Sequence, residues 1–143
     1  MSPKGDFWIS ADANFIDMAV IEWCKLFGDN NARHGWKKIV ANPDLFQEKL
    51  LVEVNLDICK WHDFIVTMRN YRDKFLAHLD SDLVMNVPEL DKALRAAQFY
   101  YLYILDHEFH SFSRAGIHAT LDEFYAERLT EAVRVYRAAF SVP

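Results

Sequence analysis

The longest pattern of apolar positions runs from Pro43 to about His78, where apolar residues recur at alternating steps of three and four. This spacing predicts a helix with one face packed against other helices, interrupted near Asn55. The face consists of Leu51, Val54, Ile58, Trp61, Ile65, Met68, Arg72, Phe75 and Leu79. One member does not suit a core, because Arg72 carries a permanent charge.

An earlier helix is predicted from about Asp12 to Phe27, where apolar residues again fall at helical spacing. We expect Gly28 to end this helix in the left-handed conformation. The loop that follows carries a short helical turn at Trp36 to Val40. Asn42 is expected to cap the next helix, with Pro43 at its first position.

Two helices are predicted after this long segment. Asn86 and Glu89 form a capping box, and the helix they open is expected to reach about Ser113. Thr120 and Glu123 form a second box, which opens the last helix. The first is expected to bury Leu90, Leu94, Ala97, Tyr101, Ile104 and Leu105, and the last Leu121, Tyr125, Leu129, Ala132 and Tyr136.

These patterns predict an all-α protein, an antiparallel bundle of four main helices plus the short helical turn, with residues 1–143 forming a single domain. Only four glycines and four prolines interrupt it, which favours long regular elements. Cys24 and Cys59 fall in apolar helical patterns, so we expect free, buried thiols. With no secretory signal and no apolar run of about 18 residues, a cytoplasmic protein without a membrane partner is expected.

The charge is unevenly distributed along the chain. A net charge of −5 argues against binding DNA or RNA non-specifically over the whole surface. Residues 60–78 nevertheless hold more cations than carboxylates: Lys60, Arg69, Arg72 and Lys74 against Asp63 and Asp73. Such a patch would bind an anion at one place, and the alternative is an ordinary solvated helix face.

Arg72 is the residue that most needs an explanation, since an unpaired guanidinium inside a helix interface is costly. It would be tolerated if it paired with a buried carboxylate, reached the surface, or lined a groove or subunit interface. His78 lies roughly 120° around the helix and about 9 Å along it, so the two would flank one cleft without touching. Alternatively, His78 only stabilises a helix end and Asp73 only pairs with Arg69.

Arg72, Asp73 and His78 resemble the R-x(4–6)-H signature of HEPN domains, in which a polar residue often follows the arginine. The wider string Arg-Asp-Lys-Phe-Leu-Ala-His-Leu-Asp is similar to the HEPN branch associated with abortive-infection proteins of bacterial phage defence. In that branch the motif also lies late in a long helix, with a further helix after it. The resemblance implies a HEPN-like helical bundle.

The resemblance also implies a metal-independent endoribonuclease acting as a homodimer, with two copies of the motif meeting across a two-fold axis. His78 would transfer protons and Arg72 would hold the scissile phosphate, with Asp73 orienting one of them. Arg69 and Lys74 are expected to bind RNA. Cleavage through the 2′-oxygen would leave a 2′,3′-cyclic phosphate without any cofactor. A role in defence or in a toxin–antitoxin system would add an antitoxin protein as a partner.

Two other hypotheses stay open. Several HEPN proteins bind partners without cutting RNA, so the alternative is a non-catalytic dimeric module for a partner protein or a nucleotide. Asp80 and Asp82 favour this alternative, because they put negative charge beside the proposed phosphate site. The third hypothesis is a metal site at Asp106, His107 and His110. No other helix supplies the Glu-x-x-His pattern of such sites, so no metal is expected.

Overall fold

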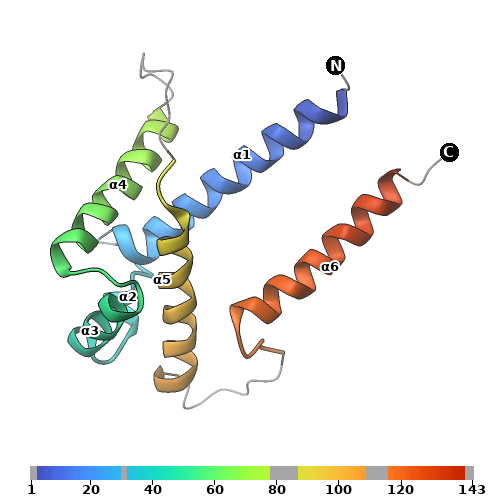
Figure 1. The fold of residues 1–143 in the computed structure, drawn as a ribbon. Coiled ribbons are helices and arrows are strands. Elements are labelled where there is room, and N and C mark those ends of the chain that lie inside the picture. Colours follow the sequence, from blue (N-terminus) through green and yellow to red (C-terminus); the bar gives the residue numbers. More distant parts are fainter. Residues whose placement is uncertain (1–2, 30–31, 78–86, 109–115, 141–143) are drawn as a thin grey trace. The chain divides into compact units, whose positions relative to one another are not determined.

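A computed structural model of the chain describes residues 3–29, 32–77, 87–108 and 116–140, and all regular elements among them are helical. The chain divides into two compact units, Met1–Ala97 and Gln98–Pro143. Figure 1 shows the helices of each. They are α1 (Pro3–Trp23), a π-helical turn (Cys24–Gly28), α2 (Trp36–Ile39), α3 (Pro43–Glu53), α4 (Ile58–Ala77), α5 (Leu90–Tyr103), a second π-helical turn (Ile104–Glu108) and α6 (Leu121–Phe140).

An aromatic cluster forms the core of the first unit. Trp23 at the end of α1 stacks on Phe27 at 5.0 Å between ring centroids and meets Trp61 of α4 edge-on at 5.9 Å. The Trp23 indole N–H donates to the Ala93 carbonyl oxygen of α5 at 3.1 Å. The rings therefore bury a large apolar area, and the buried Trp23 indole donor is satisfied.

The first helix is longer than predicted and ends differently. It starts at Pro3 instead of Asp12, and it closes in a π-helical turn where the Asp29 N–H donates to the Cys24 carbonyl at 2.9 Å. The left-handed conformation predicted for Gly28 is wrong. A glycine is favoured at position 28 because the Cβ of any other residue would stand only 3.3 Å from Cγ of Arg69.

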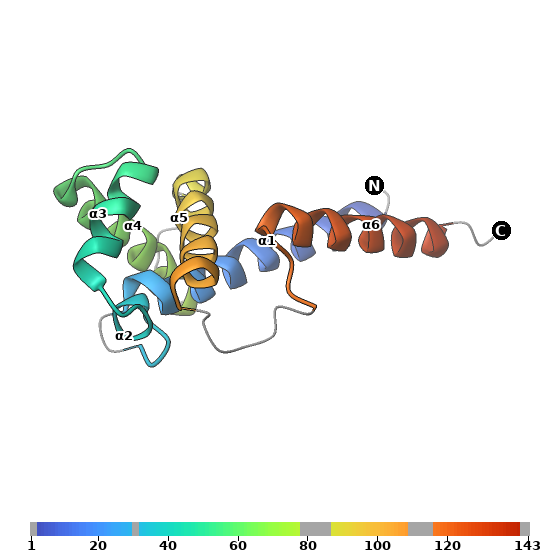
Figure 2. The same cartoon turned by 90° about the horizontal axis from the view of Figure 1, so that it is seen from below.

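The predicted helical turn, N-cap and helix break are confirmed. The Asn42 side chain accepts a hydrogen bond from the Leu45 N–H at 3.1 Å, with Pro43 opening α3. Asn55, which lies between α3 and α4, has a φ of 53°, and this left-handed backbone conformation ends α3. In Figures 1 and 2, α2 and α3 lie together near the end of the unit where α4 begins. The prediction that Cys59 is buried is wrong, since α4 exposes it.

The buried face predicted for α5 is displaced by one residue. Leu94 is 55 % exposed, whereas the buried positions of α5 are Ala93, Ala96, Tyr100 and Tyr103. The predicted burial of Leu105, in the π-helical turn that follows, is confirmed. A run of consecutive apolar residues, Phe99 to Leu105, fits more than one helical face, so periodicity alone did not select the correct one. Asn86 and Ser113 lie outside the described residues.

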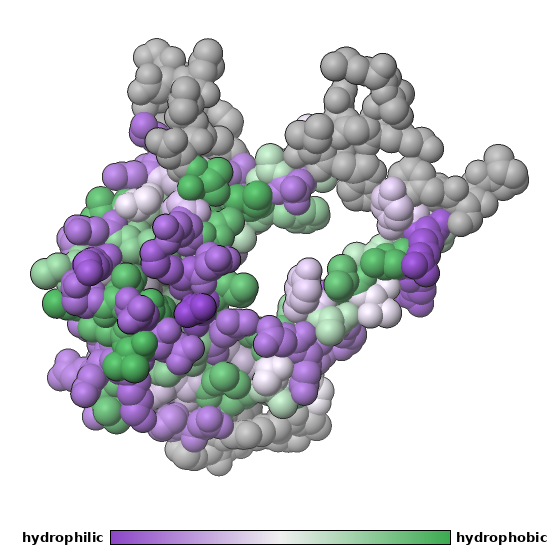
Figure 3. Space-filling view, viewed as in Figure 1, coloured by the Kyte–Doolittle hydropathy of each residue, from purple (hydrophilic) through white to green (hydrophobic). Residues whose placement is uncertain are grey.

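The last helix begins as predicted but is not buried as predicted. Thr120 Oγ1 accepts from the Glu123 N–H at 3.1 Å, and the Glu123 carboxylate accepts from the Ala119 N–H at 2.9 Å. Every described position of α6 beyond Leu121 is exposed. Figure 3 shows apolar side chains along this helix. Among the described helices, none combines the length and apolar character needed to cross a membrane.

Candidate functional site

The predicted site residues lie near the C-terminal end of α4. Arg69, Arg72, Asp73 and Lys74 all belong to this helix. His78 lies outside the described residues, as do Asp80 and Asp82. The geometry of the site is therefore built from α4 and from the segments that pack against it.

The Arg72 guanidinium is held between two carboxylates. Its Nη1 donates to both oxygens of Asp29 at 2.7 Å, and its Nε donates to Oδ1 of Asp73 at 2.9 Å. The side chain is only 15 % exposed. Hydrogen bonds to Asp29, with a further contribution from Asp73, raise the pKa of Arg72 above its ordinary value. The sequence left three arrangements open for Arg72: an ion pair with a carboxylate, a position at the surface, or a place in a groove or subunit interface. The structure shows the ion pair, with Asp29 as the partner.

The π-helical turn after α1 is what brings Asp29 to Arg72. The extra residue in the turn carries the chain from Cys24 to Asp29 across the face of α4. Cys24 lies fully buried beneath the ion pairs, and this burial raises the pKa of its thiol to about 11. Next to it, the Tyr71 hydroxyl donates to the buried Asp17 carboxylate at 2.7 Å. The charged groups of the Arg72 cluster (Cys24, Asp29, Arg72 and Asp73) are therefore paired with one another.

This pairing changes what Arg72 can do. Two carboxylates flank one guanidinium, so the cluster carries no excess of positive charge. A phosphate would have to displace Asp29 to reach Nη1. Asp73 contacts Arg72, and not Arg69 as one sequence alternative suggested. Lys74, the other predicted RNA-binding cation, is exposed on α4.

A pocket of about 170 Å³ adjoins the cluster on the side of Arg69. Its wall combines cations with aromatic and aliphatic side chains from the π-helical turn, α2, α3 and α4. The lining residues are Leu26, Phe27, Gly28, Asp29, Ala32, Gly35, Trp36, Lys37, Lys38, Gln47, Ile58, Trp61, His62, Ile65 and Arg69. Arg69, Lys37 and Lys38 thus share the pocket with a single carboxylate, which is already paired with Arg72.

Two contacts position the cations of this pocket. The aliphatic stem of Arg69 passes over Gly28, and Arg69 makes no ion pair with any described residue. The Lys37 ammonium lies over the Trp36 ring, 5.5 Å from its centroid. Trp36 is itself fixed by Phe46, with 4.8 Å between ring centroids. The pocket is therefore built on the rigid aromatic core and can receive an anion.

Sequence reasoning found Arg69 but missed its partners in the pocket. Lys37, Lys38 and His62 come from segments that periodicity assigned to a helical turn and to an exposed helix face. Asp29 was missed because it lies 43 residues from Arg72. The available signal was the lone arginine in an apolar face, which required a carboxylate from another segment.

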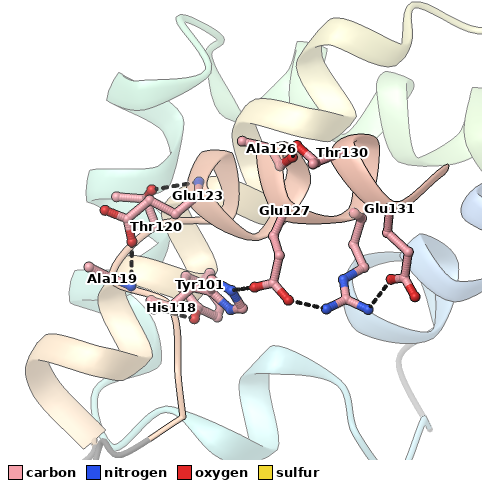
Figure 4. A network of polar contacts seen from close by, with 10 residues as sticks. Tyr101, His118, Ala119, Thr120, Glu123, Ala126, Glu127, Thr130 and Glu131 are labelled. Atoms are coloured by element: carbon pink, nitrogen blue, oxygen red, sulfur yellow. Dashed lines mark hydrogen bonds and ion pairs between the residues drawn. The ribbon is translucent and has the colours of Figure 1, made fainter. Parts of the chain in front are cut away.

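The second unit contains a polar network at the start of α6 (Figure 4). The Tyr101 hydroxyl donates to the His118 carbonyl at 2.6 Å, and the His118 ring contacts Glu127. Arg128 bridges Glu127 and Glu131. The hydrogen bond from His118, together with Arg128, lowers the pKa of Glu127. This network fixes the segment before α6 to the helix.

The metal hypothesis gains no donor set. Among the described residues, no three histidine, cysteine or acidic side chains are grouped so as to hold a metal ion. The His107 ring instead stacks on Tyr103 at 4.1 Å, with Nδ1 3.1 Å from the Tyr103 carbonyl oxygen. His110 lies outside the described residues.

Comparisons of the chain with protein-family models, curated proteins and solved structures found no match.

Proposed function

We propose that this chain is a HEPN-like helical module that binds a nucleotide through the pocket beside Arg69. The observation that carries the proposal is the contrast in charge at the end of α4. Arg72 is neutralised by Asp29 and Asp73, whereas Arg69 and Lys37 face a pocket with no second carboxylate. The phosphate-binding capacity of this region lies in the pocket.

The chemistry of the wall fits the two parts of a nucleotide. Arginine and lysine bind phosphate oxygens through charge-assisted hydrogen bonds. The side chains of Leu26, Ile58 and Ile65 offer an apolar surface to a planar base, whereas the rings of Phe27, Trp36 and Trp61, which also line the pocket, are buried. The motif that resembles HEPN domains starts three residues after Arg69. The pocket therefore supports the binding-module hypothesis, with a cytoplasmic setting in bacterial defence as the context that the resemblance suggests.

The test is a titration of the full chain with nucleoside monophosphates and a short single-stranded RNA, followed by NMR and calorimetry. We expect shifts at the indole signals of Trp36 and Trp61. Arg69→Gln should weaken binding about tenfold, the loss of one charge-assisted hydrogen bond. Arg95→Gln, an exposed arginine on α5 outside the pocket, is the matched control and should leave affinity unchanged. Equal affinity of both variants would refute the proposal.

A second candidate is the metal-independent endoribonuclease acting as a homodimer. It is favoured by one contact, since the Asp73 carboxylate orients the Arg72 guanidinium as the motif resemblance implies. RNA cleavage in EDTA, compared between wild type, His78→Ala and Arg72→Ala, tests it. Loss of cleavage in both folded variants supports the enzyme, and the same background in all samples excludes it. Asp29→Asn should raise cleavage if Asp29 restrains Arg72.

A further inference from the structure

Among the described residues that line the pocket beside Arg69, Gln47 of α3 supplies the one uncharged amide. Phe46 and Leu50 of the same helix are fully buried, so Gln47 is held at the border of a packed helix face. Its side chain is half-buried, and no hydrogen bond or ion pair joins its amide to another residue of the described chain. The wall of the pocket therefore offers a hydrogen-bond donor and an acceptor that the described residues leave unused.

The pocket is long enough to separate the place of a phosphate from the place of a base. Ile58, Ile65 and Arg69 line it at steps of seven and four along α4, and an ideal helix puts the first and last about 16 Å apart along its axis. Arg69 belongs to the second half of α4, whereas α3 lies near the end of the unit where α4 begins (Figures 1 and 2). Gln47 is therefore positioned to contact a part of the ligand other than the phosphate.

The chemistry of the glutamine side chain suits the edge of a base. Its amide presents N–H donors beside a carbonyl acceptor, so it forms two hydrogen bonds with an edge that carries an acceptor beside a donor. Adenine has such an edge, where the 6-amino group stands next to a ring nitrogen. The aliphatic side chains of Leu26, Ile58 and Ile65 in the same wall offer the apolar surface that the faces of a base require.

The number of polar groups on each base decides which base fits this wall. Adenine carries one exocyclic polar group, whereas guanine, cytosine and uracil each carry two. The single amide of Gln47 satisfies the exocyclic group of adenine. With any of the other three bases it would leave one group without a partner against the aliphatic side chains. An unpaired polar group in an apolar site weakens binding, so the wall favours adenine.

We infer that the pocket selects an adenine nucleotide and that Gln47 is its specificity-determining residue. The Gln47 amide N–H donates to a ring nitrogen of adenine, its carbonyl oxygen accepts from the 6-amino group, and Arg69 binds the phosphate. This inference rests on the proposed function and adds the identity of the base to it. It requires nothing of the second unit, because Gln47 and Arg69 both belong to the first.

Calorimetric titration of the full chain with the monophosphates of adenosine, guanosine, cytidine and uridine, and with ribose 5-phosphate, tests the assignment. Wild type should bind adenosine monophosphate at least about tenfold more tightly than each other ligand, as one bidentate pair provides. Gln47→Leu removes both hydrogen bonds and should abolish this preference. Glu48→Leu, at an exposed position of α3 outside the pocket, is the matched control and should keep it.

A second variant tests the direction of the hydrogen bonds. Gln47→Glu puts two acceptor oxygens at the same position, which suit the adjacent ring N–H and 2-amino donors of guanine. The order of affinity for the adenine and guanine nucleotides should therefore reverse. An unchanged order would contradict the contact between Gln47 and the base.

The outcomes separate this inference from the proposed function. If wild type binds adenosine monophosphate and ribose 5-phosphate equally, and Arg69→Gln weakens both, the inference is overturned while the proposed function stands. A preference for adenine that survives Gln47→Leu would also overturn it. Failure of wild type to bind any of the five ligands would refute the proposed function, and the inference with it.

Discussion

Two arginines one turn apart on α4 have opposite surroundings. Arg72 is mostly buried and bonded to Asp29 and Asp73. Arg69 is exposed in the wall of an apolar and cationic pocket. The sequence assigns both arginines to one basic patch. In the structure, however, Arg72 makes a stabilising contact, whereas Arg69 is available to a ligand. A cation contributes to binding only where no carboxylate of the same chain has neutralised it.

The largest expected difference is in the reactivity of the two cysteines. Burial raises the pKa of Cys24 from its ordinary value of 9.0 to about 11, which lowers its thiolate fraction roughly 100-fold. Cys59 is exposed. A thiol reagent at pH 8 should therefore modify Cys59 quickly and Cys24 only after unfolding. Rapid modification of both in the native protein would show that the Arg72 cluster is open.

The next effect is on stability. Arg72→Met should lower the free energy of unfolding by about 1–3 kcal/mol, because it leaves the partly buried Asp29 carboxylate without its partner. Urea unfolding measures this loss. Arg69→Met should change it by less than about 0.5 kcal/mol. Adding Asp29→Asn to Arg72→Met should restore part of the loss, and a further loss would contradict the pairing.

A smaller effect is expected from the hydroxyl that supports the cluster. Tyr71→Phe should cost about 1 kcal/mol, since Asp17 loses a hydrogen bond in a buried site. Burial and the bond to Asp17 raise the pKa of Tyr71 to about 12. Its contribution is therefore present below about pH 10 and is lost as the pH rises towards 12. Between pH 9 and 12, the free energy of unfolding should fall more steeply with rising pH for wild type than for Tyr71→Phe.

The smallest effect should come from the glycine beneath Arg69. A methyl group at position 28 stands 3.3 Å from Cγ of Arg69 and 3.4 Å from Cβ of Cys24. Gly28→Ala should therefore shift the Arg69 stem and weaken nucleotide binding a few-fold, with little loss of stability. Calorimetric titration measures the affinity. An unchanged affinity would mean that the position of Arg69 does not matter to the ligand.

The local features of the fold were predictable because they depend on neighbouring residues. The Asn42 cap, the break at Asn55 and the Thr120 box each involve hydrogen bonds or backbone angles within a few residues. The register of α5 was not predictable, because several consecutive apolar residues suit two faces. Burial of α6 was predicted from a stripe whose residues Tyr125, Leu129 and Tyr136 are exposed, because periodicity marks an apolar face without identifying what covers it.

The candidate site was predictable only in part. An arginine in an apolar face indicated that a partner was needed, and the basic excess located Arg69. The identity of the partner depends on the π-helical turn, which brings Asp29 to Arg72 across 43 positions of sequence. No short-range pattern encodes that contact. The pocket depends on the same turn and on α2, so it became visible only in three dimensions.

The most direct test measures nucleotide affinity and the free energy of unfolding together for Arg69→Gln and Arg72→Gln. We predict opposite outcomes: Arg69→Gln loses affinity and keeps its stability, whereas Arg72→Gln loses stability and, while folded, keeps its affinity. The reverse result, with binding abolished by Arg72→Gln and retained by Arg69→Gln, would contradict the assignment of the phosphate site to the pocket.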